Sequence, residues 1–274
     1  MGPGSKSSWS ISTQDQEQEP LYVKSSEIDI IEFQAILFDL DGTLLDTLAD
    51  IAFAANAGLK RLGFPTHPIE SYRRFVGDGA GCLARRALPA DHQDDETVDR
   101  CRQVIAAEYA KCWADKTKPY PGVPELLADL QARRIPMGVL SNKPHEATIT
   151  VVEGYFPDHN FQVVRGALPS VPVKPDPAGA IQIAEELDIL PGRFVYLGDT
   201  DTDMRTAVAA GMFPAGALWG FRNAEELTAN GAKVLLKTPK EVAGLFNGTT
   251  KKESITYTPE ISVSYMEKKT TEKD

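Results

Sequence analysis

Residues 36–43 have the sequence Ile36-Leu37-Phe38-Asp39-Leu40-Asp41-Gly42-Thr43, an apolar run that ends in two acids and a turn. A short, uninterrupted apolar run is typical of a strand buried on both faces of a parallel sheet. Because side chains alternate along an extended chain, Asp39 and Asp41 are expected on the same side. Two carboxylates this close repel each other unless a cation lies between them or one binds a proton. The stretch therefore predicts a charged site at the end of a buried strand, with a solvated Asp-Gly turn as the alternative.

Apolar runs of the same kind recur four times further along the chain, at residues 136–140, 161–164, 194–197 and 214–219. They alternate with stretches of helix-forming residues that carry periodic apolar positions, at 124–134, 144–154, 177–188 and 202–210. Strands that alternate with helices fold into a parallel sheet with right-handed connections. We therefore predict an α/β protein whose core is a doubly wound, Rossmann-like parallel sheet.

The region from 51 to 117 departs from this alternation. Its helix-like segments lie at 51–62, 69–76, 78–87 and 94–113, and its pattern favours no strand. We predict a small all-helical cap domain at 51–117, inserted after the first strand, with the α/β core formed by 31–50 and 118–247. Such an insertion would stand over the carboxyl ends of the strands, where α/β proteins bind ligands.

The two ends of the chain differ from the rest in composition. Residues 1–30 are rich in Ser, Gln and Glu, and we predict a flexible extension there. Residues 248–274 are predicted to be a polar tail. Within that tail, apolar and polar residues alternate from Ile255 to Tyr265, which leaves an edge strand as the alternative.

The charge balance excludes several classes of function. The chain has 274 residues and a formal net charge of −10, from 29 Lys and Arg against 39 Asp and Glu. An acidic surface repels phosphodiester backbones and anionic lipids, so we expect neither a nucleic-acid nor a membrane partner. Cys82, Cys101 and Cys112 lack the spacing of a metal site and fit a reducing compartment. We expect a cytoplasmic protein.

A second acidic cluster, Gly198-Asp199-Thr200-Asp201-Thr202-Asp203, follows the predicted strand at 194–197. Acids in the first turn of a helix also serve as caps, so a purely structural role is the alternative for Asp203. Because the carboxyl ends of parallel strands meet at one edge of the sheet, Asp199 and Asp203 would join Asp39 and Asp41. Carboxylate oxygens with positions left for water and phosphate suit Mg²⁺.

Two further stretches complete a site for an anion. Ser141-Asn142 ends the run at 136–140 and offers a hydroxyl and backbone N–H groups to phosphate oxygens. Lys174 lies in Val173-Lys174-Pro175-Asp176-Pro177, where flanking prolines reduce the entropy that is lost when the lysine is held in place. A solvated surface charge is the alternative for this lysine.

These residues resemble the haloacid dehalogenase-like hydrolases over about residues 31–245, with four motifs in order. The first motif is 38–47, and Ser141, Lys174 and the run 198–203 match the second, third and fourth. The resemblance implies that Asp39 is the nucleophile, forming an aspartyl-phosphate. It implies that Asp41 protonates the leaving oxygen and then activates water, while Ser141 and Lys174 hold the phosphoryl oxygens.

The resemblance also implies a metal site. Mg²⁺ would be bound by Asp39, the backbone carbonyl of Asp41 and Asp199, with Asp203 ligating through water or orienting Lys174. The helical residues 51–117 would then be a mobile cap that closes over the substrate.

The chain is more closely similar to the phosphoglycolate phosphatase subgroup, in 76–79, 141–144, 198–204 and 219–222. This similarity implies a phosphatase for a small phosphorylated metabolite, first 2-phosphoglycolate, acting as a monomer or homodimer. The expected substrate-binding residues are Thr43, Asn142, Gly77, Arg73 and Arg74. A glycine turn with solvent-facing arginines is the alternative for Gly77, Arg73 and Arg74. Arg222, just beyond a strand end, is expected either to reach the rim of the site or to form a surface ion pair. Three other functions remain open. The chain is then a phosphatase for pyrophosphate, a sugar phosphate or a nucleotide, or a phosphomutase, or a non-catalytic regulatory protein.

Overall fold

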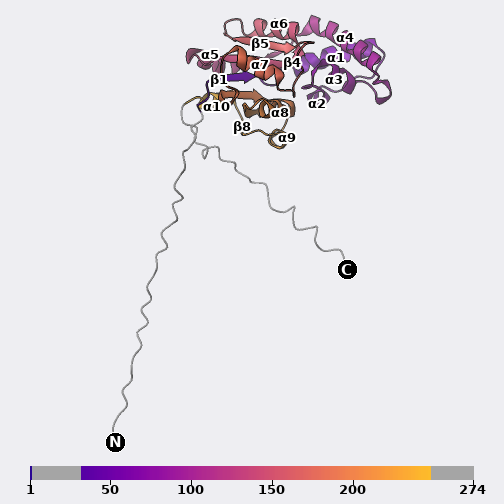
Figure 1. The fold of residues 1–274 in the computed structure, drawn as a ribbon. Helices are drawn as coiled ribbons and strands as arrows, with labels where there is room; N and C mark the ends of the chain where they lie inside the picture. The colour runs from indigo at the N-terminus through magenta and orange to yellow at the C-terminus, as the bar shows by residue number, and fades with distance from the viewer. Residues whose placement is uncertain (2–31, 248–274) are drawn as a thin grey trace.

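The core is a six-stranded parallel sheet, in a computed structural model that describes Met1 and residues 32–247. The rest of the predicted extension and the tail, including its possible strand, lie outside the described residues. The strand order is β5-β4-β1-β6-β7-β8. Figure 1 shows the sheet with its flanking helices and labels four of these strands, β1, β4, β5 and β8. The strands are β1 (Ala35–Phe38), β4 (Met137–Pro144), β5 (Val163–Ala167), β6 (Phe194–Gly198), β7 (Phe213–Ala217) and β8 (Val234–Leu236). The order reverses beside β1, which is where doubly wound sheets bind ligands.

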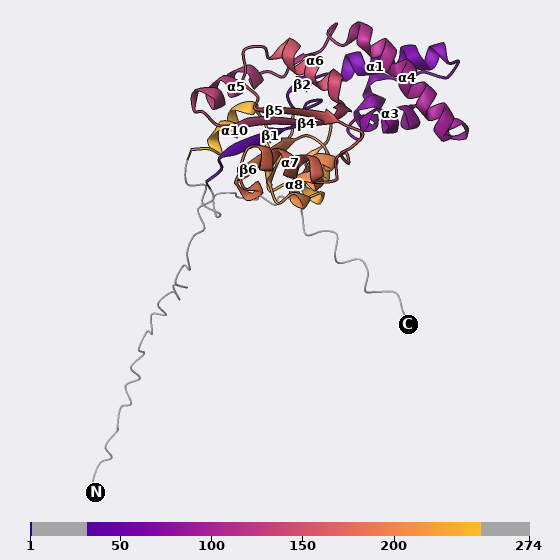
Figure 2. The ribbon, with the colours of Figure 1, turned by 45° about the horizontal axis from the view of Figure 1, so that its top comes forward.

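Helices cover both faces of this sheet, as Figure 2 shows. On one face lie α5 (Val123–Ala132), α6 (His145–Tyr155) and α10 (Pro239–Gly244); on the other lie α7 (Ala178–Glu186) and α8 (Asp201–Ala209). Strand β1 supplies both layers, because Ile36 and Phe38 pack into the first core and Ala35 and Leu37 into the second. Helix α9 (Ala224–Ala229) packs beside α8. The predicted doubly wound α/β fold is confirmed.

The helical region between β1 and the rest of the sheet has a hydrophobic core of its own. It contains α1 (Leu48–Arg61), α2 (Tyr72–Phe75), α3 (Gly79–Ala87) and α4 (Asp95–Cys112). Short 3₁₀ turns, η1 (Ile69–Ser71) and η2 (Ala90–His92), connect them, and a third, η3 (Pro191–Arg193), precedes β6. Buried Leu59, Tyr72 and Cys101 belong to this core of the helical region, which is separate from the two cores of the sheet. Helices α1, α3 and α4 lie beyond one end of the sheet (Figure 2).

The two connections between the helical region and the sheet lie side by side. Strands β2 (Leu45–Asp46) and β3 (Lys118–Pro119) form an antiparallel pair in which Asp46 is opposite Lys118. Asp50, in the first turn of α1, is 1% exposed. Its Oδ2 accepts hydrogen bonds from the backbone N–H groups of Lys116, at 2.9 Å, and Thr117, at 2.8 Å. These bonds hold the start and the end of the helical region together.

Two further properties concern the described residues alone. Cys82, Cys101 and Cys112 are all free thiols. No helix between residues 32 and 247 is long and apolar enough to cross a membrane.

Candidate active site

A buried lysine joins two of the predicted acids at the carboxyl end of the sheet. The Lys174 ammonium donates to Asp39 Oδ1 and to Asp203 Oδ1, each at 2.7 Å. Asp39 directly follows β1, Lys174 lies in the loop before α7, and Asp203 is in the first turn of α8. Burial alone would lower the pKa of Lys174, but the two carboxylates hold it above its ordinary value, so the lysine is charged. Residues 135 positions apart in the chain thus meet at one ion pair.

The orientation of Asp203 follows from the start of its helix. Thr200 is the N-cap of α8 and forms a capping box with Asp203, whose Oδ2 accepts from the Thr200 backbone N–H at 3.0 Å. The hydrogen bond from the Thr200 N–H fixes Oδ2 of the Asp203 carboxylate at the N-terminal end of the helix. The other oxygen is left to face Lys174. The capping role and the ion pair are therefore both present in this one side chain.

Asp199 is held by hydrogen bonds from two distant parts of the chain. Its Oδ1 accepts from the Thr43 hydroxyl at 2.8 Å, and its Oδ2 accepts from the Phe221 backbone N–H at 2.7 Å. Gly42 and Gly220 flank the carboxylate so closely that a Cβ on either would overlap it. Thr43 is therefore a hydrogen-bond partner of Asp199. It was predicted to bind substrate, but it does not border the cavity.

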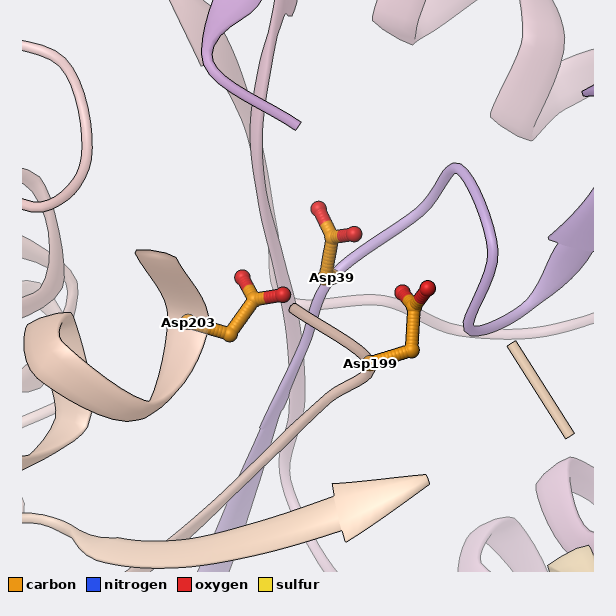
Figure 3. A group of neighbouring side chains, drawn as sticks. All are labelled: Asp39, Asp199 and Asp203. Atoms are coloured by element: carbon orange, nitrogen blue, oxygen red, sulfur yellow. The ribbon is translucent and has the colours of Figure 1, made fainter. Parts of the chain in front are cut away.

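The three acids Asp39, Asp199 and Asp203 gather around one point (Figure 3). One oxygen from each lies within 4.8 Å of the others. Burial, with the Asp203 carboxylate, raises the pKa of Asp39 well above its ordinary value and that of Asp199 to about 7. Buried carboxylates that resist ionisation become stable as anions when a cation lies between them. The hard oxygen donors present therefore fit a divalent cation.

Asp41 has a second lysine as its partner. The Lys143 ammonium contacts both carboxylate oxygens of Asp41, at 2.8 and 2.9 Å. It also lies 4.6 Å from the centre of the Tyr109 ring, within the range of a cation–π contact. Burial alone would lower the pKa of Lys143, yet Asp41 and Tyr109 together raise it. Lys143 was not among the predicted site residues, although its place two residues after Ser141, at the end of the strand beside β1, was the available signal.

Asn142 connects the Lys174 loop with the helical region. Its Oδ1 accepts from the Lys174 backbone N–H at 2.9 Å, and its Nδ2 donates to the Lys174 carbonyl at 2.9 Å. The same Nδ2 donates to the Gly77 carbonyl at 3.1 Å. Ser141 accepts a bond from the Lys143 backbone N–H at 3.2 Å. The Asn142 amide therefore holds backbone on both sides of the site.

A cavity of about 420 Å³ opens above these residues. Asp39, Asp41, Ser141 and Lys143 form its polar end, and Asn142 and Gly77 also border it. The remaining wall comes from α1, α3, α4 and α6. The cavity thus lies between the sheet edge and the helical region, with both predicted catalytic acids exposed to it.

The three arginines considered in the sequence, Arg73, Arg74 and Arg222, lie away from this cavity. Neither Arg73 nor Arg74 borders the cavity. Arg73 donates to the Gly220 carbonyl at 3.0 Å, and Arg74 is exposed to solvent. Arg222 donates to the Val76 carbonyl at 3.0 Å and pairs with Glu226 at 3.0 Å. A substrate contact by Arg73 and Arg74 has no support in this geometry, because α2 is a single turn that directs Arg73 to the loop after β7.

Comparison with known proteins agrees with this geometry. The family model of the haloacid dehalogenase-like hydrolases matches residues 36–217. A phosphoglycolate phosphatase from Psychrobacter arcticus is 33% identical over 201 residues, covering 71% of this chain and 87% of that protein. One from Pseudomonas putida is 30% identical over 205 residues, covering 73% of this chain and 75% of that protein. A crystal structure from Lactobacillus delbrueckii subsp. bulgaricus has a TM-score of 0.73 at 28% identity, covering 78% of this chain and 98% of that one.

The chain therefore belongs to the haloacid dehalogenase-like hydrolase family. Within that family it is a phosphatase, of the subgroup that resembles the phosphoglycolate phosphatases.

Proposed function

We propose that the chain is a Mg²⁺-dependent phosphate monoester hydrolase that acts through an aspartyl-phosphate on Asp39. Its substrate is a small phosphorylated metabolite, and 2-phosphoglycolate is the first candidate because the relatives named above are phosphatases of that compound. The observation that carries the proposal is the position of Asp39. Its carboxylate borders the cavity while Lys174 and two further acids surround it from the protein side.

Asp39 is the nucleophile in this proposal. One of its oxygens attacks phosphorus, the bond from phosphorus to the leaving oxygen breaks, and the phosphoryl group is transferred to the carboxylate. Lys174 and the Ser141 hydroxyl would hold the equatorial oxygens, where charge is spread in the transition state. The ammonium of Lys174 lies 2.7 Å from Asp39 Oδ1, within reach of an oxygen bound beside it. Water then attacks phosphorus and releases phosphate, which restores Asp39.

Asp41 would move the protons of both steps. In the first step it donates a proton to the leaving oxygen, and in the second it takes a proton from the attacking water. The Asp41 carboxylate borders the cavity and is held by Lys143 through both oxygens. Lys143 therefore acts as a positioning residue, because it fixes the direction in which the carboxylate faces the substrate.

Asp39, Asp199 and the backbone carbonyl of Asp41 would hold Mg²⁺, with Asp203 close by. The ion would neutralise the charge between the nucleophile and the phosphate oxygens. Asp203 contributes by keeping Lys174 in place through its 2.7 Å contact. Thr43 supports the same site, since its hydroxyl fixes Asp199.

The helical residues 51–117 are proposed to form the cap over a core of residues 31–50 and 118–247. Three observations support this division. The helical region has its own hydrophobic core, its two connections are adjacent, and its helices form one wall of the cavity.

The test is phosphate release from 2-phosphoglycolate and a panel of phosphate esters, nucleotides and pyrophosphate, with Mg²⁺ and with chelator. Asp39→Asn should release no phosphate while it keeps the wild-type circular dichroism spectrum. Asp158→Asn, a change at an exposed carboxylate, is the matched control and should be fully active. Wild-type turnover by Asp39→Asn would contradict the nucleophile assignment, and turnover that persists in chelator would contradict the metal.

The same panel separates the alternative functions. A preference for pyrophosphate, a sugar phosphate or a nucleotide would identify a sibling phosphatase. Isomerisation of a hexose phosphate without phosphate release would identify a phosphomutase. Binding of beryllium fluoride without turnover would indicate a regulatory protein, although Asp39, Asp41, Lys174 and Asp199 are all present in this chain. Light scattering would distinguish the expected monomer from a homodimer.

A further inference from the structure

The cavity is larger than the smallest candidate substrate requires. Its volume is about 420 Å³. The roughly nine non-hydrogen atoms of 2-phosphoglycolate take about 270 Å³, even at roughly 30 Å³ per atom, the share of a water molecule in the liquid. With its phosphoryl group at Asp39, such a molecule would leave the far part of the cavity unfilled.

Away from the polar end, most of the residues that border the cavity are apolar. They include Leu83 of α3, Ile105 of α4, Trp113, which follows α4, and Ala147 and Val151 of α6, while Arg102, Glu146 and Thr150 are the charged and hydroxyl side chains among them. Contact with an apolar group is favourable there, since it removes apolar surface from water on both sides.

The wall offers no unpaired cation to a second negative group. Among the described residues, the cations that border the cavity are Lys143 and Arg102. Lys143 already contacts both oxygens of Asp41, and Arg102 donates to Asp99 Oδ1 at 2.6 and 2.9 Å. A carboxylate placed in this apolar part of the cavity would have to compete with Asp41 for Lys143 or with Asp99 for Arg102, so the loss of its hydration would be costly there.

We propose that the helical wall selects phosphate monoesters whose alcohol carries an uncharged, apolar group. This inference rests on the proposed function, since the phosphoryl group is placed at Asp39. The apolar group lies against Leu83, Ile105 and Trp113, and 2-phosphoglycolate occupies only the polar end. The specificity-determining residues are those of α3, α4 and α6, rather than Arg73 and Arg74.

The test is a series of methyl, butyl and hexyl phosphate, whose leaving alcohols have similar acidity. We expect kcat/KM to rise about fourfold for each added methylene until the cavity is filled, the factor that corresponds to about 0.8 kcal/mol per buried CH₂. Butyl phosphate should also exceed 3-phosphonooxypropionate, which has a similar length but ends in a carboxylate. A kcat/KM that does not change along the series, while the esters are turned over, would overturn the inference and leave the proposed function intact.

Two neighbouring alanines of α4 supply matched variants. Ala106 borders the cavity and Ala107 does not, and both are exposed, so a glutamate is tolerated by the fold at either position. Ala106→Glu places a carboxylate in the apolar wall and should abolish the rise with chain length. Ala107→Glu adds the same charge to the same helix and should keep the wild-type profile. Identical profiles in the two variants would overturn the inference.

A binding measurement separates this inference from the phosphatase chemistry. Methyl-, butyl- and hexylphosphonate with Mg²⁺ resist hydrolysis, and their Kd is measured by calorimetry. If no ester is turned over, the proposed function fails. A Kd that still falls about fourfold per methylene in the wild type, and not in Ala106→Glu, would support an apolar subsite, whereas a constant Kd would overturn it.

Discussion

Replacing Lys174 by methionine removes one charge from the centre of the acid cluster. The ammonium lies 2.7 Å from both Asp39 and Asp203, and the lysine is only 4% exposed. Methionine has a similar length and fills the space of the aliphatic chain, so the change is mainly electrostatic. Without the ammonium, the two carboxylates and Asp199 face one another with no cation from the protein. The repulsion favours protonation of the acids or unfolding.

The size of the effect follows from this burial. Removing one partner from a buried ion pair costs about 3–5 kcal/mol, because the remaining charge is left without compensation. A single domain is stable by about 5–15 kcal/mol in total, so the metal-free variant should lose a large part of its stability. Turnover should fall about 10²- to 10³-fold, the usual loss when one donor to a developing negative charge is removed.

Urea denaturation measures the first effect, in chelator and in Mg²⁺ at pH 7. The loss should be largest in chelator and smaller in Mg²⁺, because the ion takes over part of the compensation. Lys60→Met, at an exposed position of α1, is the control and should change stability by less than about 0.5 kcal/mol. A Lys174→Met variant with the stability of this control would refute the electrostatic reasoning, and one with wild-type kcat would remove Lys174 from the site.

Three further predictions concern the same cluster. Lys143→Met should lower kcat and leave KM nearly unchanged, because Asp41 loses the partner that fixes its direction. Steady-state kinetics test this prediction, and an unchanged kcat would count against it. Gly42→Ala should weaken Mg²⁺ binding measured by calorimetry, since a Cβ there overlaps the Asp199 carboxylate and the backbone φ is +98°; wild-type affinity would contradict the steric argument. The metal-free protein should lose stability as the pH rises from about 4 to about 7. In the folded state Asp199 has a pKa of about 7 and keeps its proton in this range, whereas in the unfolded chain its pKa is the ordinary 3.8 and the proton is released. Urea titrations at pH 5 and pH 8 should show this fall in chelator and a smaller one in Mg²⁺; equal stability in chelator would contradict it.

The sheet and its main helices could be predicted because their sequences carry local patterns. Five of the six parallel strands overlap a short apolar run of the sequence, and β1 is buried along its whole length. Strand β8 was not predicted, since it has three residues and only Leu236 is buried. The pair β2 and β3 was also missed. Two-residue strands have no periodicity, and their pairing depends on residues about 70 positions apart.

The acids of the site could be predicted for a different reason. Parallel strands bring their carboxyl ends to one edge, so the position after an apolar run is enough to group Asp39 with Asp199. The partner of each side chain could not be predicted in this way. The contact from Lys143 to Asp41 spans 102 positions and depends on side-chain geometry. The direction of Arg73 depends on the single turn of α2, which the spacing of apolar residues does not determine.

The paired strands β2 and β3 make the helical region exchangeable. The chain leaves the sheet and returns to it at neighbouring residues, with Asp46 opposite Lys118 and Asp50 bonded to the returning backbone. A segment whose ends are this close can be replaced by another of different length without separating the strands that carry the catalytic groups. If the proposed function and the proposed apolar subsite hold, the phosphoryl chemistry and the choice of leaving group are encoded in separable parts of the chain. Grafting a different set of helices between these two strands is therefore a direct route to a new substrate range on an unchanged reaction centre.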